Sequence, residues 1–109
     1  MEIRTLTPKE LDSRIKGNKY VFVLDVRSED KFKEYNLKHS VNIPKTTIFE
    51  MEDAENVKDI PLPKDKEIII ACTTGNSATK CANILAKQNF NVTVLEGGLT
   101  AWKEYSKSK

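Results

Sequence analysis

The sequence predicts an α/β fold in which parallel strands are covered by helices on both faces. Apolar strand-like runs alternate with helical patterns along the whole chain, and this alternation is typical of the class. The runs VFVL (21–24) and IIIA (68–71) are continuous rather than alternating, as in strands that are buried on both faces. We therefore expect these two runs to form the central strands of the sheet.

The expected elements follow one another with short connections. In chain order they are a strand at 2–6, a helix from Pro8, a strand at 20–26, a short helix near 28–35, a strand at 39–43, helical turns through 45–58, a strand at 67–72, a helix from about Ser77, a strand at 91–95 and a helix near 99–105. No internal repeat interrupts this order.

The chemistry of two helices supports their placement. In the first, Thr7 can act as N-cap and Glu10 can complete a capping box, while Gly17 can end the helix. In the helix from about Ser77, the apolar side chains repeat at the spacing of one helix face. They are Ala78, Cys81, Ala82 and Leu85. This stripe predicts that Cys81 is buried against the sheet.

Length and composition indicate one domain over residues 1–109, with residues 106–109 as a disordered tail. Hydrophobic residues make up 39% and charged residues 31% of the chain, the balance of a globular protein. The net charge of +2 is too small and too scattered to indicate a nucleic-acid partner. No export signal and no membrane-length apolar run is found, so we expect a cytoplasmic location, no membrane partner and two free cysteines.

Cys72 stands where a buried strand ends and a helix is about to begin. In parallel α/β sheets, ligands bind beyond the carboxyl ends of the strands. The small residues after Cys72, with glycine and asparagine among them, allow a tight loop whose N–H groups can hold an anion, with the helix N-terminus behind them. The thiolate would be the first such anion. Residue type alone also allows a small buried hydrophobic side chain, and that alternative stays open here.

Partners for Cys72 are few. The only histidine, His39, lies at the entry to a strand, where a structural hydrogen-bonded role is favoured over a Cys–His pair. The two cysteines and this histidine do not match the ligand spacing of a zinc site, so no metal or other cofactor is expected.

Four separated stretches occur in the order and at the spacing of one known domain. They are LDVRSEDKF (24–32), HSVNIP (39–44), IIIACTTGNSA (68–78) and FNVTVLEGGLTAW (90–102). On these residues the chain resembles the rhodanese, or thiosulfate sulfurtransferase, family and looks like a stand-alone single-domain member. The resemblance implies a central parallel five-stranded sheet flanked by helices, with Cys72 as the nucleophile that carries sulfane sulfur as a persulfide.

The resemblance also implies roles for other residues. Asp25 and Arg27 match positions that brace the active-site loop from below. Gly97 and Gly98 match the turn before the final helix, and Trp102 matches its packing residue. The residues of the loop would bind the substrate, and they are Thr73, Thr74, Gly75, Asn76, Ser77 and Ala78.

Two positions depart from the family pattern. Many active members carry arginine at position 77, where this chain has Ser77, and Lys38 replaces the glycine that usually precedes the histidine. A serine hydroxyl cannot replace the charged fork of an arginine. Thr73, Thr74 and Lys80 remain as further groups that could bind an anion. The short loop and the missing arginine both argue against the related phosphatase activity.

Two functions therefore follow. The first is an enzyme that moves sulfur from thiosulfate or a low-molecular-weight persulfide to a thiol or cyanide by a ping-pong mechanism. The second is a sulfur carrier or binding module that exchanges persulfide with a partner protein, which Ser77 favours because a protein donor brings its own contacts. A third possibility makes Cys81 the resolving thiol of a redox switch, although its place on the core face favours a structural role.

Overall fold

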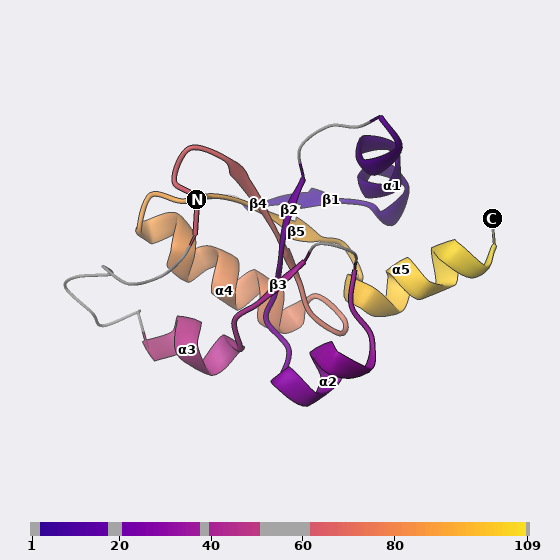
Figure 1. The fold of residues 1–109 in the computed structure, drawn as a ribbon. Coiled ribbons are helices and arrows are strands. Elements are labelled where there is room, and N and C mark those ends of the chain that lie inside the picture. Colours follow the sequence, from indigo (N-terminus) through magenta and orange to yellow (C-terminus); the bar gives the residue numbers. More distant parts are fainter. Residues whose placement is uncertain (1–2, 18–20, 38–39, 51–61, 109) are drawn as a thin grey trace.

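The computed structural model describes residues 3–17, 21–37, 40–50 and 62–108. Strands and helices alternate along the chain (Figure 1). The strands are β1 (Arg4–Leu6), β2 (Phe22–Asp25), β3 (Val41–Asn42), β4 (Glu67–Ala71) and β5 (Asn91–Leu95). The helices are α1 (Pro8–Lys16), α2 (Glu29–Glu34), α3 (Lys45–Glu50), α4 (Asn76–Lys87) and α5 (Gly98–Lys107).

The strands form one parallel sheet in the order β1-β5-β4-β2-β3, which confirms the predicted fold class. The central strand β4 is buried from Ile68 onward and is hydrogen-bonded to β5 and β2. The continuous apolar run IIIA is therefore explained by helices above and below it. β2, the other predicted central strand, lies between β4 and the edge strand β3.

Each face of the sheet has its own apolar core. Leu24, Ile68 and Ile70 pack with α3 and α4 on one face, whereas Val23 and Ile69 pack with α1 and α5 on the other. The predicted stripe of α4 is buried in the first core, together with Ile84. The capping box of Thr7 and Glu10 is formed as expected, and Gly17 caps the end of α1.

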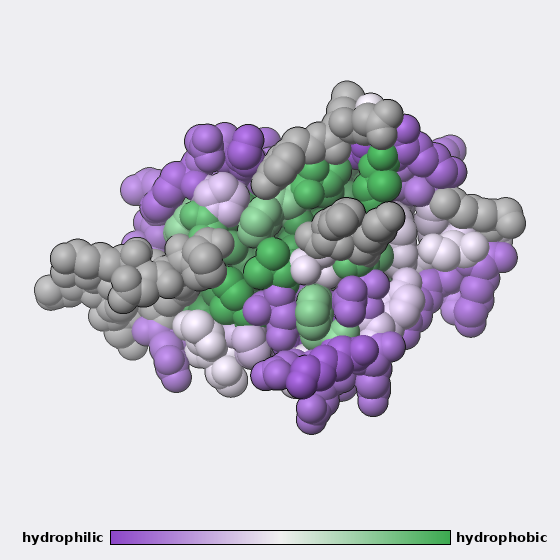
Figure 2. All heavy atoms as spheres, in the orientation of Figure 1, coloured by the Kyte–Doolittle hydropathy of each residue, from purple (hydrophilic) through white to green (hydrophobic). Residues whose placement is uncertain are grey.

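The surface of α2 differs from that of the other helices, because none of its residues is buried. Figure 2 shows hydrophilic residues over the region of α2 and along the rim of this face, with apolar residues in the middle. α2 therefore contributes no side chain to either apolar core. In the described part of the chain, no helix is long and apolar enough to cross a membrane.

Several boundaries differ from those expected. α5 continues to Lys107, into the segment predicted as a tail, and the Tyr105 hydroxyl near its end donates a 2.7 Å hydrogen bond to Asp12 of α1. α4 begins at Asn76, in agreement with the helix predicted from about Ser77, and Gly75 turns the chain before it with a φ of +105°. The predicted helical turns beyond Glu50 fall on residues 51–61, outside the described residues.

Candidate active site

Cys72 directly follows β4 and lies at the base of the loop that leads into α4. Its residue surface is 4% exposed. The sulfur atom accepts hydrogen bonds from two backbone amides, Gly75 N at 2.9 Å and Ala78 N at 3.4 Å. The loop thus curls around the sulfur as predicted, and its amides favour a negative charge there.

The N-terminus of α5 holds the same loop from the other side. Leu99 N donates to the carbonyl oxygen of Cys72 at 2.8 Å, and Thr100 N donates to that of Thr73 at 3.0 Å. This approach requires Gly98, since a Cβ atom on it would lie 2.4 Å from the Cys72 oxygen. Gly98 also has a φ of +63°. The predicted turn glycine therefore allows close backbone contact between α5 and the Cys72 loop.

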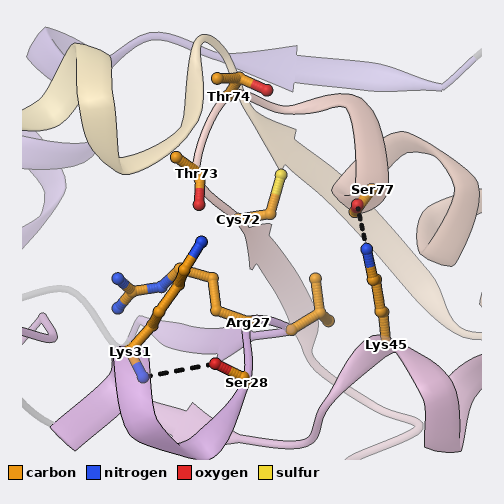
Figure 3. A pocket seen from close by; sticks show the side chains of 9 residues that line it. Arg27, Ser28, Lys31, Lys45, Cys72, Thr73, Thr74 and Ser77 are labelled. Carbon is orange, nitrogen blue, oxygen red and sulfur yellow. Dashed lines mark hydrogen bonds between the residues drawn. The ribbon is translucent and has the colours of Figure 1, made fainter.

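A pocket of about 200 Å³ opens in front of Cys72. It is lined by Val26, Arg27, Ser28, Lys31, Lys45, Cys72, Thr73, Thr74 and Ser77 (Figure 3). These residues come from the β4–α4 loop and from the segments that follow β2 and β3. The pocket lies where the carboxyl ends of neighbouring parallel strands meet, the usual place for a ligand in such a sheet.

The predicted loop residues take different positions around this pocket. Thr73, Thr74 and Ser77 line it. Gly75 and Ala78 are buried and contribute their amides to the Cys72 sulfur. Asn76 is exposed and is not among the residues that line the pocket.

Asp25 and Arg27 form a buried ion pair on the opposite wall. The Arg27 Nη2 atom lies 2.6 Å from Asp25 Oδ2, with side-chain exposures of 8% and 2%. Arg27 also donates to the carbonyl oxygen of Tyr35, after α2. Asn42 donates to the carbonyl oxygens of both Asp25 and Arg27, at 3.0 and 2.9 Å. Among the described residues, the hydrogen bonds of the pair therefore hold the β2–α2 wall of the pocket. The bracing of the Cys72 loop that the resemblance implies stays a prediction.

Lys31 and Lys45 are pocket residues that the sequence did not reveal. Lys31 lies on α2, and Lys45 begins α3 directly after the segment that leaves β3. Both lysines follow shortly after the carboxyl ends of β2 and β3, where ligands bind in parallel sheets. This position in the sequence is the signal that could have identified them. Lys80, which the sequence offered as a possible anion ligand, instead lines a separate hollow with Phe49, Asn83, Ile84 and Lys87.

Cys81 is fully buried on α4 and belongs to the same apolar core as Cys72. Burial, with a smaller effect of the nearby Cys72, raises its pKa to about 12. Cys81 therefore stays a neutral thiol at physiological pH, and both cysteines are free. This placement agrees with the structural role predicted for Cys81.

His39 and Lys38 lie outside the described residues, so the structural role of His39 stays a prediction. Within the described ranges, no group of three or more histidine, cysteine, aspartate or glutamate residues is arranged to hold a metal ion.

Comparison with known proteins identifies relatives along the full chain. The protein named "Putative sulfurtransferase YtwF" of Bacillus subtilis is 28% identical over 109 residues, which is 100% of this chain and 99% of that protein. "Adenylyltransferase and sulfurtransferase UBA4" of Candida albicans is 30% identical over 106 residues, but this chain covers only 24% of its length.

Solved structures agree with the fold. A rhodanese-related protein from Thermoplasma volcanium superposes with a TM-score of 0.77 at 27% identity, covering 94% of this chain and 92% of that one. A single-domain sulfurtransferase of Saccharomyces cerevisiae, RDL2, gives a TM-score of 0.77 at 19% identity over 100% of this chain and 95% of that one. The family model described as the rhodanese-like domain matches residues 7–105, and the chain therefore belongs to the rhodanese family.

Proposed function

We propose that this protein is a sulfurtransferase that carries sulfane sulfur as a persulfide on Cys72. The observation that carries the proposal is the position of the Cys72 sulfur, which faces a pocket and accepts hydrogen bonds from Gly75 N and Ala78 N. Cys81 is not a competing nucleophile, because it is fully buried and its pKa is raised to about 12.

The reaction has two steps. The Cys72 thiolate attacks the outer sulfur of thiosulfate or of a low-molecular-weight persulfide or polysulfide. The S–S bond of the donor breaks, its electron pair leaves with the remaining fragment, and a Cys72 persulfide forms. A thiol or cyanide then attacks the outer sulfur of the persulfide and regenerates the thiolate. The loop amides stay in place to hold the negative charge in both steps.

Steady-state kinetics test this mechanism. With thiosulfate and cyanide as the two substrates, double-reciprocal plots should give parallel lines, as expected for a ping-pong mechanism. Cys72→Ser should abolish turnover, and Cys81→Ser, the matched control, should retain it. Turnover that survives Cys72→Ser would overturn the proposal.

The second candidate is a carrier that receives persulfide from a partner protein and hands it on. It is supported by the relative UBA4, whose name joins adenylyltransferase and sulfurtransferase and of which this chain covers 24%. Persulfide formation with a protein persulfide, but with neither thiosulfate nor glutathione persulfide, would favour this candidate over the first.

The proposal includes a cytoplasmic location. Both cysteines are free thiols in the structure, and reducing compartments keep thiols in this state. Fractionation of cells that express the protein, followed by detection with an antibody, tests this point. Recovery in an exported or membrane fraction would contradict it.

A further inference from the structure

We infer that Lys31 and Lys45 form an anion-binding pair at the mouth of the Cys72 pocket, and that this lysine pair selects small sulfur donors with negative charge beside the transferred sulfur. The inference rests on the proposed function, since it names the class of donor that the same pocket takes. Thiosulfate is a donor of this kind, because a sulfonate group is bonded to its sulfane sulfur.

The two lysines reach the pocket from different walls. In Figure 3 the Lys31 side chain extends from α2 toward Thr73 and Cys72. Lys45 comes from the other side, with its Nζ atom 3.5 Å from the Ser77 hydroxyl. An anion bound in front of Cys72 would therefore lie between two ammonium groups and the hydroxyls of Thr73 and Ser77.

The charge of this pocket is not balanced by its own residues. Arg27 also lines it, but its guanidinium is paired with the buried carboxylate of Asp25. Of the described residues that line the pocket, none is an aspartate or a glutamate. Among the residues that the structure describes, neither Lys31 nor Lys45 takes part in an ion pair. Two positive charges thus remain for a ligand.

The size of the pocket limits the donor. Its volume of about 200 Å³ lies below the roughly 300–1,000 Å³ of sites that enclose drug-sized ligands. A small oxyanion fits this space, whereas only the end of a larger donor could enter. When the Cys72 thiolate takes the outer sulfur of thiosulfate, the S–S bond breaks and its electron pair leaves with sulfite. The lysine pair faces the oxygens of this group before and after the step, and no proton needs to move.

The lysine pair also replaces a charge that the loop itself lacks. Position 77 holds a serine, which offers one hydroxyl, and this hydroxyl is the group that Lys45 approaches. The positive charge is thus supplied from α2 and α3 rather than from the loop, so it can be removed without changing the amides that surround the Cys72 sulfur.

Charge-selective alkylation tests the pair without any sulfur donor. Iodoacetate and iodoacetamide are nearly equal in size, but only the first is an anion. The rate constant for alkylation of Cys72 by each reagent is obtained from the mass shift of the peptide that contains Cys72. The quantity compared is the rate constant for iodoacetate divided by that for iodoacetamide. In Lys31→Gln/Lys45→Gln this ratio should fall about three- to tenfold, and 0.5 M NaCl should reduce it in the wild type, because salt screens exposed charges. An unchanged ratio in the double variant would overturn the inference.

The matched control is Lys33→Gln/Lys107→Gln, which removes two positive charges, as the test variant does. Both lysines are exposed, are paired with Glu29 and Glu104, and do not line the pocket. The rate ratio of this control should stay at the wild-type value. An equal fall in the control would mean that overall charge, and not the lysine pair, sets the preference, and would also overturn the inference.

Kinetics with two donors complete the test. The double variant should lose about tenfold in kcat/KM for thiosulfate, mainly through KM, and keep its kcat/KM for cysteamine persulfide, a small donor that has a terminal sulfane sulfur but no oxyanion group. An equal loss with both donors would contradict the inference. If neither donor delivers sulfur to the wild type, the proposed function fails, while the alkylation ratio still decides whether the lysine pair attracts anions.

Discussion

The amide of Leu99 donates a 2.8 Å hydrogen bond to the carbonyl oxygen of Cys72. This bond joins the first turn of α5 to the end of β4, the point at which the proposed nucleophile stands. The position of the Cys72 loop therefore depends on a segment far away in the sequence, and Gly98 is the residue that allows the approach.

Gly98→Ala should lower both stability and the reactivity of Cys72. The new Cβ atom would meet the carbonyl oxygens of Cys72 and Thr73 at 2.4 and 2.6 Å, on a residue whose φ is +63°. We expect the free energy of unfolding to fall by about 2–4 kcal/mol, measured by urea denaturation. Alkylation of Cys72 by iodoacetamide should slow, because a displaced loop loses its amide contacts with the sulfur.

Gly17→Ala is the control, because Gly17 has an ordinary φ of −79° and lies at the end of α1, away from the loop. It should leave the alkylation rate of Cys72 at the wild-type value. If Gly98→Ala also left stability and rate unchanged, the contact between α5 and the loop would not hold the site.

Asp25→Asn should destabilise the protein strongly. The substitution leaves the guanidinium of Arg27 buried without its carboxylate partner, and loss of one partner of a buried ion pair costs about 3–5 kcal/mol. Asp25→Asn/Arg27→Met should recover part of this loss, because it removes the unpaired charge. Urea denaturation measures both.

The exposed ion pair of Glu29 and Lys33 provides the comparison for this experiment. Glu29→Gln should change the free energy of unfolding by less than about 1 kcal/mol. An equally small effect of Asp25→Asn would show that the Asp25–Arg27 pair does not support the β2–α2 wall.

Because of Cys81, the free energy of unfolding should decrease as the pH rises in the alkaline range. Burial raises the pKa of its thiol from 9.0 to about 12, so the unfolded chain releases this proton first as the pH rises. The contribution of Cys81 is therefore fully present below pH 9 and is lost progressively between pH 9 and about 12. The loss amounts to about 1.4 kcal/mol per pH unit within this window.

Cys81→Ala isolates this effect from other groups that titrate at alkaline pH. The difference in unfolding free energy between wild type and Cys81→Ala should shrink by about 1.5 kcal/mol between pH 9 and pH 10.5. A difference that stays constant over this range would mean that Cys81 ionises as easily in the folded protein as in the unfolded chain.

Much of the fold could be predicted from local patterns. The runs at 21–24 and 68–71 identified strands at the centre of the sheet, and the stripe from Ala78 to Leu85 identified the buried face of α4. Both patterns reflect burial, which the periodicity of apolar residues records directly. The end of α5 was missed because it depends on a tertiary contact, the hydrogen bond from Tyr105 to Asp12.

The site was predictable only in part, for the same reason. The Cys72 loop is continuous in sequence, so its small residues indicated a curled backbone around the sulfur. Lys31 and Lys45 have no local pattern that separates them from other surface lysines. Their role at the pocket arises only when β2, β3 and β4 bring three loops together.

Intact mass measured after incubation with thiosulfate, and separately with glutathione persulfide, tests the central claim most directly. The account predicts a gain of one sulfur, about 32 Da, that is removed by cyanide, is lost in Cys72→Ser and is kept in Cys81→Ser. No gain with either donor would contradict sulfur transfer from small donors and would leave only the carrier that exchanges persulfide with a partner protein. A gain that persists in Cys72→Ser would contradict the assignment of Cys72 as the sulfur carrier.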